Sequence, residues 1–519
     1  MTLRRTIRSW LSFLIWCVLF GVAYTQSPLY SSNQNTYFLH GAACANQGDL
    51  RQDWLANTRD PTPLFSALVC VTLRWFHAPS LFYFYYLLLL GLYFTTLYQL
   101  AARQVDLRPR SRRLIFWALF FLIHSAAFRF VLSRTLGAQW MYAFEGGLAN
   151  HRLLGSVFEP SAFGVLLLVA VNLALQEKHY PAFLALALAT WFHPTYLLSA
   201  VLLFLGIETW KLAEAHQTNN THSTRQTLRS LTKDGLIFFV LILPSVFYSL
   251  TFVVGIAPQV RQEAHSILYQ IRIPHHADPR NWFNASSVIQ LLLMLAGLYW
   301  TRHPGLRWLL GLPLLLGALL TLAVLFLGNP SLALLFPWRV SVVLVPLSVT
   351  ILVSRLVGLI PSEAEQPHRE LLIWVLPSLS TALIATTLLL GWVRISLDLQ
   401  RKRAQPERPL IAFVAQTKQP QDCYLIPLKL QDFRLASGAP IYVDFKSHPY
   451  APLEVIEWYR RYRLADQFYR NPSCEALAQL SSEGVNHLVL PSTVTLDCST
   501  LERVYGDDSY QLFRIHPAN

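Results

Sequence analysis

The chain has 519 residues, of which 53% are hydrophobic and only 14% are charged. A soluble domain usually has about 25% charged residues, so this composition excludes an ordinary soluble protein and indicates an integral membrane protein. The net charge of +13 is then typical of Lys and Arg gathered in cytoplasmic loops. No basic run is interleaved with aromatic residues in a soluble segment, so nucleic acid is not an expected partner.

The first apolar segment follows the basic stretch MTLRRTIR and resembles a signal peptide. Its end, VAYTQSP, matches a small-x-small cleavage site poorly. We therefore predict an anchor that is retained in the membrane.

Apolar stretches long enough to approach a membrane span, roughly 20 residues, recur along the chain. They are 9–25, 80–101, 114–132, 158–176, 235–254, 286–300, 308–327, 338–358 and 371–392. A further stretch, 182–209, is interrupted by WFHPTY, and the residue before a proline disfavours helix. We expect two short helices there that meet at His193-Pro194. The sequence thus predicts a polytopic α-helical membrane protein with about 11 transmembrane helices.

The distribution of Lys and Arg predicts which loops lie outside. With a cytoplasmic N-terminus, the long outer loops are 26–79, 133–157 and 255–285, with a shorter one at 328–339, and they are poorer in Lys and Arg than the cytoplasmic connections. This bias supports the orientation, and an odd number of passes places the C-terminus on the exoplasmic side.

From about residue 393 the composition becomes more polar, with prolines and short strand patterns. Strands are predicted at 423–427, 441–445 and 485–491. Helices are predicted at 454–469 and 474–484, the second ended by Gly484. We expect a small exoplasmic α/β domain over 393–519, after a multi-pass domain over 1–392.

Six cysteines are present. Cys17 and Cys70 lie in apolar runs, where cysteine commonly packs as a small apolar residue. Cys423, Cys474 and Cys498 lie in the C-terminal domain, where one disulfide can form if the domain is outside the cytoplasm. Their spacing does not say which pair, and no Cys/His spacing is typical of zinc.

The first outer loop contains GDLRQDW, with Asp49 and Asp53 close together, and then the run 62–76. That run is typical of a helix in the membrane interface, with Arg74 and Trp75 at the headgroup level. The two acids either belong to a solvated, helix-capping loop or act as a general base or metal ligands.

The second outer loop contains Glu145, His151, Arg152 and Glu159 beside two glycines. Glu159 precedes Pro160, and an acid before an N-terminal proline favours the start of a helix. Glu145 and His151 lack such an explanation, so they are either ordinary loop residues or candidate site residues.

Two further segments carry ionisable residues at or near the membrane. His193 lies at the helix break, where an ionisable residue either serves a function or bonds a freed carbonyl. The loop at 268–283 contains Arg272, His275, His276 and Arg280. Adjacent histidines point in different directions in an extended chain, so a shared metal is not expected, whereas arginine suits phosphate.

Arg339, in FPWRVS, begins a late span. It either reaches the interface as a long basic side chain beside Trp338 or clamps a lipid phosphate, and together with Arg272 and Arg280 we favour the clamp. Acids, histidines and arginines on one side of the membrane suit group transfer from a lipid-phosphate donor. A base deprotonates an acceptor hydroxyl, cations stabilise the leaving phosphate, and apolar helices hold the lipid tail.

The order of these motifs resembles the GT-C class of membrane glycosyltransferases, and within it a bacterial group with GT-C-like architecture. The residues that carry the likeness are NQNTYFLHG and GDLRQDW in the first outer loop, FEP and WFHPTYLL around the broken helix pair, IPHH, PWR, and the C-terminal stretch GAPIYVDFKSHPYAPLEVIEWYRR.

The resemblance implies transfer of a sugar from a polyprenyl-phosphate donor at the exoplasmic face of the inner (plasma) membrane. It implies Asp53 as the base, with Asp49 second and Glu145 as a further candidate. The acids form DxxxD rather than an adjacent pair or DxD, so a divalent cation, Mg²⁺ or Mn²⁺, is left open. No WWD-type motif is present, so the acceptor is left open too.

Two other hypotheses fit the same residues. A transporter or lipid flippase would explain the broken helix at His193, although no inverted repeat is evident. An inactive scaffold would use its exported domain to bind a partner, with Lys446, His448 and Tyr450 as surface candidates.

Overall fold

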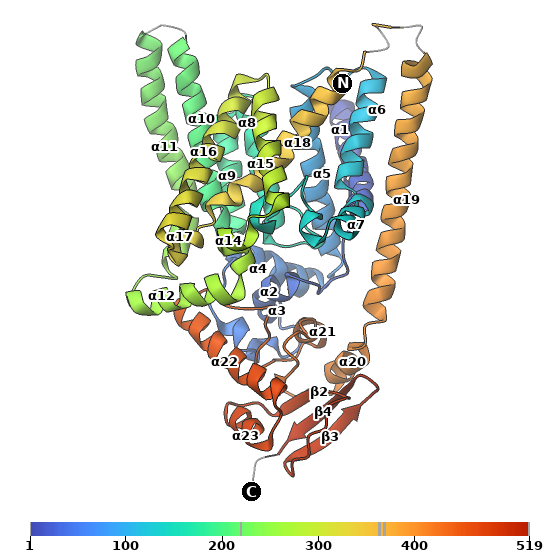
Figure 1. Ribbon diagram of the computed structural model, residues 1–519, viewed down its shortest axis with the longest axis vertical. Helices are drawn as coiled ribbons and strands as arrows, with labels where there is room; N and C mark the ends of the chain where they lie inside the picture. The colour runs from blue at the N-terminus through green and yellow to red at the C-terminus, as the bar shows by residue number, and fades with distance from the viewer. Residues whose placement is uncertain (1, 218–220, 362–364, 367–369, 517–519) are drawn as a thin grey trace. The chain divides into compact units, whose positions relative to one another are not determined.

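The computed structural model describes residues 2–217, 221–361, 365–366 and 370–516. The chain forms two compact units (Figure 1). Unit 1 comprises Met1–Gln26, Tyr83–Tyr248 and Ile273–Ser396. Unit 2 comprises Ser27–Phe82, Ser249–Arg272 and Leu397–Asn519. Each unit is therefore assembled from segments that are far apart in the sequence.

Unit 1 is built from helices, most of which run roughly parallel to one another in Figure 1. They are α1 (Thr2–Tyr24), α5 (Leu81–Ala102), α6 (Arg110–His124), α7 (Ala126–Thr135), α8 (Val165–Ala174), α9 (His179–Phe192), α10 (Leu197–Gln217), α11 (Thr221–Leu250), α15 (Ala285–Trp300), α16 (Pro304–Leu327), α18 (Ser341–Gly358) and α19 (Leu376–Arg403). Short helices connect them, among them α13 (Pro274–Ala277), α14 (Pro279–Trp282) and α17 (Pro330–Ala333).

Within the described residues, six helices are long and apolar enough to cross a membrane, or seven if the pair α6 and α7, bent by 52°, counts as one span. The expected number of about eleven is not confirmed. The shortfall has a physical reason, because several apolar stretches form helices shorter than a bilayer requires. Pro160–Ala174 and Ala285–Trp300 are examples.

The break expected at His193-Pro194 is confirmed. Helix α9 ends at Phe192, His193 adopts an extended backbone, and a turn of 3-10 helix, η7 (Pro194–Tyr196), leads into α10. Proline at the first position of this turn lacks an N–H that a continuous helix would need. The break leaves His193 between two apolar helices.

Helix α18 lies in the interior of unit 1. The apolar 18-residue stretch within Pro330–Gly358, which includes α18, is 83% buried within the protein. The corresponding stretch within Leu371–Arg403, which includes α19, is only 22% buried. A helix that is apolar on all sides and covered by other helices forms the core of a bundle. The segment that leads into α18 therefore also lies in the interior of unit 1.

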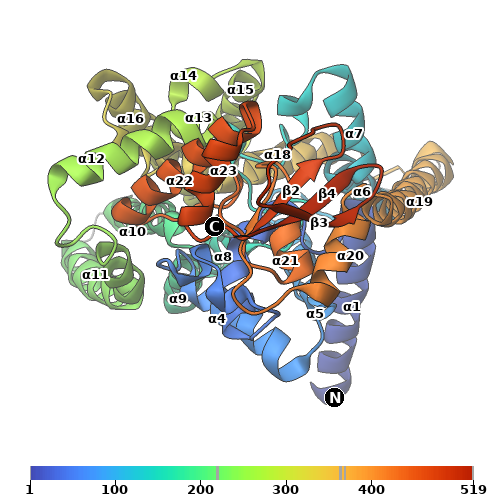
Figure 2. The same cartoon turned by 90° about the horizontal axis from the view of Figure 1, so that it is seen from below.

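Unit 2 contains a four-stranded sheet in the order β1-β2-β4-β3, and Figure 2 shows β2, β4 and β3 as neighbours. The strands are β1 (Tyr424–Leu425), β2 (His487–Pro491), β3 (Leu501–Gly506) and β4 (Tyr510–Ile515). β1 pairs parallel to β2, and the other pairs are antiparallel. The connection between β1 and β2 carries α21 (Phe433–Ser437), α22 (Pro452–Arg470) and α23 (Cys474–Ser482).

The remaining elements of unit 2 come from earlier parts of the chain and from α20 (Arg408–Thr417). They are α2 (Gln34–Tyr37), α3 (Leu39–Cys44), α4 (Pro63–Val71) and α12 (Pro258–Ile267), with 3-10 turns at η1 (Leu50–Gln52) and η2 (Leu55–Asn57). Helix α4 continues into a π turn, η3 (Thr72–Phe76), in which Arg74 and Trp75 are exposed. The helix expected over 62–76 is therefore present.

The expected elements of the C-terminal domain are mostly confirmed. Strands form within 423–427 and 485–491, and helices cover 454–469 and 474–482. Gly484, with φ of +94°, follows the end of α23 as expected. The strand expected at 441–445 is wrong, because only Ile441 pairs there, in an isolated parallel bridge to Tyr424.

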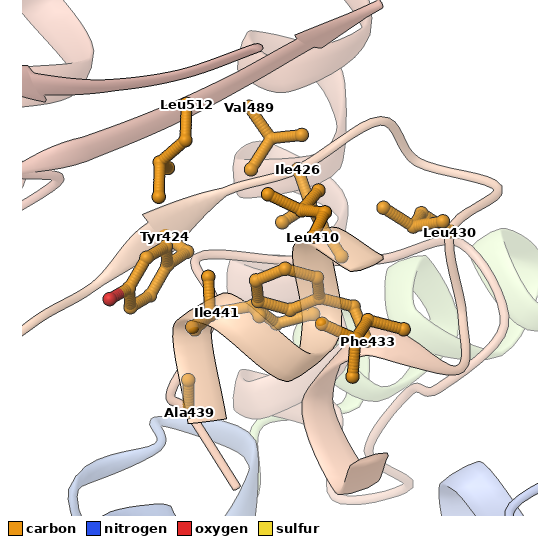
Figure 3. Close-up of a cluster of buried hydrophobic side chains, with 11 residues drawn as sticks. Leu410, Tyr424, Ile426, Leu430, Phe433, Ala439, Ile441, Val489 and Leu512 are labelled. Carbon is orange, nitrogen blue, oxygen red and sulfur yellow. The ribbon is translucent and has the colours of Figure 1, made fainter. Parts of the chain in front are cut away.

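The core of unit 2 joins one face of the sheet to two helices (Figure 3). Leu410 of α20 and Phe433 of α21 pack with Tyr424, Val489 and Leu512 of three strands, and all five are at most 2% exposed. Burial of such side chains contributes roughly 1.5–3 kcal/mol each. This core holds the segment from α20 to β4 together as one domain.

The first outer loop folds onto this domain instead of standing alone. Gly48 lies so close to Gly438 that a Cβ added at Gly48 would come within 2.4 Å of the Gly438 carbonyl oxygen. The Asp49 amide donates to that same oxygen at 2.8 Å. Both glycines have positive φ, +53° and +67°, a conformation that glycine adopts without steric cost. The glycine of GDLRQDW is thus required for docking.

Unit 2 contains two disulfides, Cys44–Cys70 and Cys474–Cys498, whose Cα atoms are 5.6 and 5.7 Å apart. The first ties α3 to α4, and the second ties α23 to the loop after β2. Cys70 is thus bonded rather than a packing residue as expected. Disulfides persist in oxidising compartments and are rare in the cytosol, so both disulfides favour an exported unit 2.

Cys17 and Cys423 are the free cysteines. We therefore expect the full-length protein, when it is denatured and alkylated without reductant, to gain two alkyl groups. After reduction it should gain six, since the chain has six cysteines. Mass spectrometry of the purified membrane protein gives both numbers. Six alkyl groups without reductant would contradict an exported, oxidised unit 2.

Candidate functional site

Four candidate residues of unit 1 form a group that we call the histidine–arginine cluster: His151, His193 and Arg339, which are buried, and His276, which is half-buried. They come from the loop after the 3-10 turn η5 (Leu148–Asn150), from the α9–α10 break, from α13 and from the 3-10 turn η9 (Pro337–Val340). The last of these turns leads directly into the buried helix α18. Residues separated by almost 200 positions are thus brought together in the centre of the unit.

Arg339 is the only residue of this cluster with a permanent charge. It is 8% exposed, and one Nη atom donates to Nε2 of His193 at 3.0 Å. Because a guanidinium can only donate, His193 accepts at Nε2 and is neutral. The Arg339 guanidinium carbon also lies 4.9 Å from the centre of the Tyr196 ring.

Within the part of the chain that the structure describes, no carboxylate lies within 4.0 Å of the Arg339 nitrogens, and its Nε has no hydrogen-bond partner. A buried charge without a counter-ion is costly. Two neutral partners do not offset that cost. This position is therefore suited to an anion that is not part of the protein.

His151 and His276 stack, with ring centres 4.9 Å apart and planes inclined by 13°. Nδ1 of His276 donates to the Ala149 carbonyl at 2.6 Å, which leaves Nε2 for other contacts. Burial, and then the nearby His275 and Arg339, lower the pKa of His276 to about 3. Burial first and Arg339 second also hold the pKa of His151 well below its usual range. Both rings are therefore neutral at physiological pH.

The backbone around the cluster is strained. Ala149, Asn150 and Phe336 adopt left-handed φ values of 58°, 56° and 49°, which cost of order 1–3 kcal/mol each for residues other than glycine. Asn150 directly precedes His151, and Phe336 directly precedes the turn that contains Arg339. Such strain is concentrated at functional sites, where surrounding contacts hold it.

Contacts within the second outer loop, and between this loop and α18, hold this strain. The Leu148 amide donates to the Ser341 hydroxyl at 2.8 Å, and the Gly147 amide donates to the His151 carbonyl at 2.7 Å. A Cβ at Gly147 would come within 2.4 Å of the Ser341 oxygen. The second glycine of the pair in this loop is therefore needed for close packing beside the cluster.

Two acids of the same loop are also buried in unit 1. Glu145 is 6% exposed, and its Oε1 accepts from Arg129 at 3.0 Å. Burial raises the pKa of Glu145 to about 7, against the opposing charges of Arg129 and Arg152. Its Oε2 has no hydrogen-bond partner among the described residues. Glu145 is thus able to exchange a proton near neutral pH.

Glu159 is 3% exposed and begins the 3-10 turn η6 (Pro160–Gly164), as its place before proline predicts. Its side chain does not cap that turn, however, and Oε1 accepts from the Ser161 hydroxyl at 2.8 Å. The capping explanation is therefore incomplete. The Arg152 guanidinium carbon lies 4.4 Å from the centre of the Tyr142 ring. The negative charge of Glu159 is one of the causes that raise the pKa of Arg152.

Sequence reasoning missed Arg129, Tyr24 and Tyr196, which surround these acids and the cluster. The Arg129 guanidinium carbon lies 4.0 Å from the Tyr24 ring centre, and the Tyr196 hydroxyl donates to the Ser161 carbonyl at 2.7 Å. Arg129 lies within the apolar pair α6–α7, and a charge in an apolar stretch was the signal that could have found it.

An apolar cavity of about 510 Å³ lies beside the cluster within unit 1. Its walls include Leu148, Trp338 and Ser341, which are neighbours of cluster residues along the chain. Arg280, which is exposed, also lines it. An elongated apolar ligand with an anionic group fits this combination of an apolar wall with one arginine.

His275 is exposed, and its ring centre is 4.1 Å from that of His276. The two rings are close because α13 is a helical turn rather than the extended chain assumed from the sequence. Among the described residues, no group of three or more His, Cys, Asp or Glu side chains is placed to hold a metal ion. We therefore assign no metal to the cluster.

The other candidates, Asp49, Asp53 and Arg272, belong to unit 2. Asp53 is fully buried, and its Oδ1 accepts from the amides of Leu55 and Ala56 at 2.9 and 3.3 Å. Its Oδ2 accepts from the Ile441 amide at 3.0 Å and lies 2.9 Å from Nε of Arg434. With both oxygens occupied, Asp53 is suited to hold the loop in place and poorly suited to accept a proton from a substrate.

Arg434 extends this network to Asp444, at 3.0 Å. Arg272 donates to the Lys446 carbonyl and lies 5.2 Å from the Phe445 ring centre. Asp49 is half-buried, and its amide rather than its carboxylate makes the contact with Gly438. These contacts connect early and late segments of the chain within unit 2.

Comparison with known proteins adds little to this geometry. Residues 405–465 are similar to a domain of unknown function, DUF6798. The matched segment includes Arg434, Asp444 and His448 of unit 2. No curated protein matches the chain.

We expect Asp53→Ala to destabilise unit 2 by about 3–5 kcal/mol, because it leaves the buried Arg434 with one carboxylate instead of two. Asp49→Ala should change the free energy of unfolding by less than about 0.5 kcal/mol. Thermal unfolding of the purified full-length protein, followed by limited proteolysis of unit 2, compares the two. Equal stability of both variants would contradict a structural role for Asp53.

Proposed function

We propose that the protein is a membrane transferase that uses a polyprenyl-phosphate-linked sugar, with the donor phosphate bound at the histidine–arginine cluster. The observation that carries this proposal is the buried Arg339 guanidinium, which lacks a carboxylate partner among the described residues. Phosphate matches the fork of guanidinium donors and supplies the missing negative charge.

The apolar surroundings support a lipid-linked phosphate over a soluble one. The cavity beside the cluster is lined mostly by apolar side chains, including Trp282, Met294 and Leu344. A polyprenyl chain in this cavity would place its phosphate toward Arg339, since Trp338 lines the cavity and precedes Arg339 in the chain. The six apolar helices are compatible with a bilayer around this site.

The reaction is a displacement at the anomeric carbon of the donor sugar. The acceptor hydroxyl oxygen forms the new bond to that carbon, and the bond from the carbon to the phosphate oxygen breaks. Polyprenyl phosphate leaves with the bonding electrons, and Arg339 stabilises its added charge. The acceptor proton passes to a carboxylate, which is a general base.

Glu145 is the better candidate for this base than Asp53. A base is most effective when its pKa lies near the working pH, and burial raises the pKa of Glu145 to about 7. Asp53 has both oxygens engaged by hydrogen bonds to the backbone of neighbouring segments. Glu159, with one oxygen left without a partner among the described residues, is the alternative in the same loop.

The exported position of unit 2 that its disulfides favour agrees with a reaction on the exoplasmic side, and with the orientation drawn from the charge bias. Acceptors outside the cytoplasm include cell-envelope glycans and proteins. The side chains of the cluster do not specify the sugar, which is identified by testing a panel of donors.

We expect Arg339→Gln to lower the transfer rate by at least about 100-fold, the effect of losing one stabilising donor to a leaving oxyanion. The measurement is the release of polyprenyl phosphate from a panel of polyprenyl-phosphate sugars in proteoliposomes. Arg134→Gln, which removes an exposed arginine of α7, is the matched control and should retain full activity.

Two results would contradict this proposal. Release at the normal rate from Arg339→Gln would separate the cluster from the reaction. Binding of the donor lipid that depends on Arg339, without any release of polyprenyl phosphate, would instead support a lipid flippase or transporter.

The transfer rate kcat/KM should rise with pH through about 7 and level off above it, because Glu145 accepts a proton only when ionised. Below pH 7 the carboxyl is mostly protonated, since its pKa is raised. Glu145→Gln should remove this rise and most of the activity, whereas Glu145→Asp should retain a rise. An unchanged profile in Glu145→Gln would assign Glu145 to pairing with Arg129 alone and transfer the role to Glu159.

A further inference from the structure

Unit 1 contains a second arginine-lined cavity, far from the histidine–arginine cluster. It has a volume of about 630 Å³ and lies where the ends of α15 and α18 meet the turn between α5 and α6. Arg355, near the end of α18, follows Arg339 by roughly 24 Å along the helix axis at 1.5 Å per residue. The two cavities therefore belong to opposite ends of the same buried helix.

Four charged residues at this end of unit 1 form two ion pairs with each other. Asp106 pairs with Arg108 through two contacts of 2.9 and 3.1 Å. Arg112 donates to the Ile360 carbonyl at 2.8 Å and to Glu365 at 3.3 Å. These pairs leave no net charge at the cavity.

Arg302 and Arg355 differ from those four residues. Both line the cavity, and neither side chain has a hydrogen-bond or ion-pair partner among the described residues. The Arg302 amide, in contrast, is fixed by Gln104, to whose side-chain oxygen it donates at 3.2 Å. The cavity thus presents two guanidinium groups whose positive charge is not paired with a carboxylate among the described residues.

Apolar side chains complete the cavity. Trp300, Leu356 and Leu359 line it, and they are 49%, 60% and 80% exposed. Large exposed apolar side chains beside basic residues are typical of the depth at which lipid headgroups meet acyl chains. A small soluble anion would leave these side chains uncovered, whereas a lipid would cover them.

We propose that this cavity binds an anionic phospholipid, with its phosphate between Arg302 and Arg355 and an acyl chain along Trp300, Leu356 and Leu359. Charge complementarity selects the occupant, because basic pockets between spanning helices on the cytoplasmic side recognise anionic headgroups. The inference requires the apolar helices to cross a bilayer and does not depend on the transferase reaction.

The test uses the full-length protein in a neutral detergent and native mass spectrometry with phosphatidylglycerol and phosphatidylcholine as probes. We expect preferential binding of phosphatidylglycerol, and an affinity about tenfold lower in Arg302→Gln/Arg355→Gln, which loses two charge-assisted contacts. The control, Arg134→Gln/Arg229→Gln, removes two exposed arginines outside the cavity and should bind as the wild type does.

Equal affinity of the two double variants would overturn the proposal and leave these arginines as determinants of orientation only. Displacement of phosphatidylglycerol by millimolar inorganic phosphate would overturn it as well, in favour of a phosphate site. If the double variant does not fold, acyl-brominated phosphatidylglycerol provides a second measurement. It should quench wild-type fluorescence more than that of Trp300→Phe, and equal quenching would contradict the assigned acyl position.

Discussion

The buried charge of Arg339 is the constraint on which the centre of unit 1 depends. A guanidinium cannot lose its proton in a protein, so its surroundings must adapt to it. His193 adapts by accepting at Nε2, and His151 and His276 adapt by remaining neutral, since burial and the Arg339 charge both disfavour a second positive charge. The three histidines are thus neutral, and Arg339 carries the single positive charge of the cluster.

Several other buried charges among the described residues are paired with opposite charges, in contrast to Arg339. Arg434 lies between Asp53 and Asp444, at 2.9 and 3.0 Å, and Lys402 pairs with Asp432. Such pairs are expensive to break, so they fix the register of distant segments. In unit 2 they attach the first outer loop to the C-terminal domain, where Gly48 and Gly438 allow the backbones to touch.

Local signals in the sequence were sufficient for several features. The break at His193-Pro194, helix α22 and the end of α23 at Gly484 follow from proline, periodicity and a terminal glycine, which act on neighbouring residues. The sequence also identified Glu145, His151, His193, His276 and Arg339 as candidates, because ionisable residues beside apolar helices are uncommon. The convergence of the four cluster residues could not be derived, since it depends on how four separate segments pack together before α18.

The features that the sequence did not predict also depend on long-range packing. GDLRQDW does not show that Asp53 meets Arg434, a partner almost 400 residues away. Cys70 looks like an apolar packing residue because its partner, Cys44, lies in another helix. The hairpin β3–β4 was missed because both strands are half-exposed and lack strong alternation. The expected number of about eleven spans is not confirmed, because an apolar stretch in the sequence does not show the length of the helix within it.

Exposure separates the two arginine sites of unit 1 and predicts how each would behave. Arg339 is 8% exposed, so an anion beside it experiences a strong attraction that water and salt screen little. Such a position can stabilise charge that develops during a reaction. Arg302 is exposed and Arg355 is half-buried, so their attraction for an anion is weaker and salt-dependent, as suits a lipid that exchanges with the surrounding bilayer. Because Arg339 lies in the turn that leads into α18 and Arg355 lies near the end of this mostly buried helix, the same element can position a reaction at one end and a structural lipid at the other.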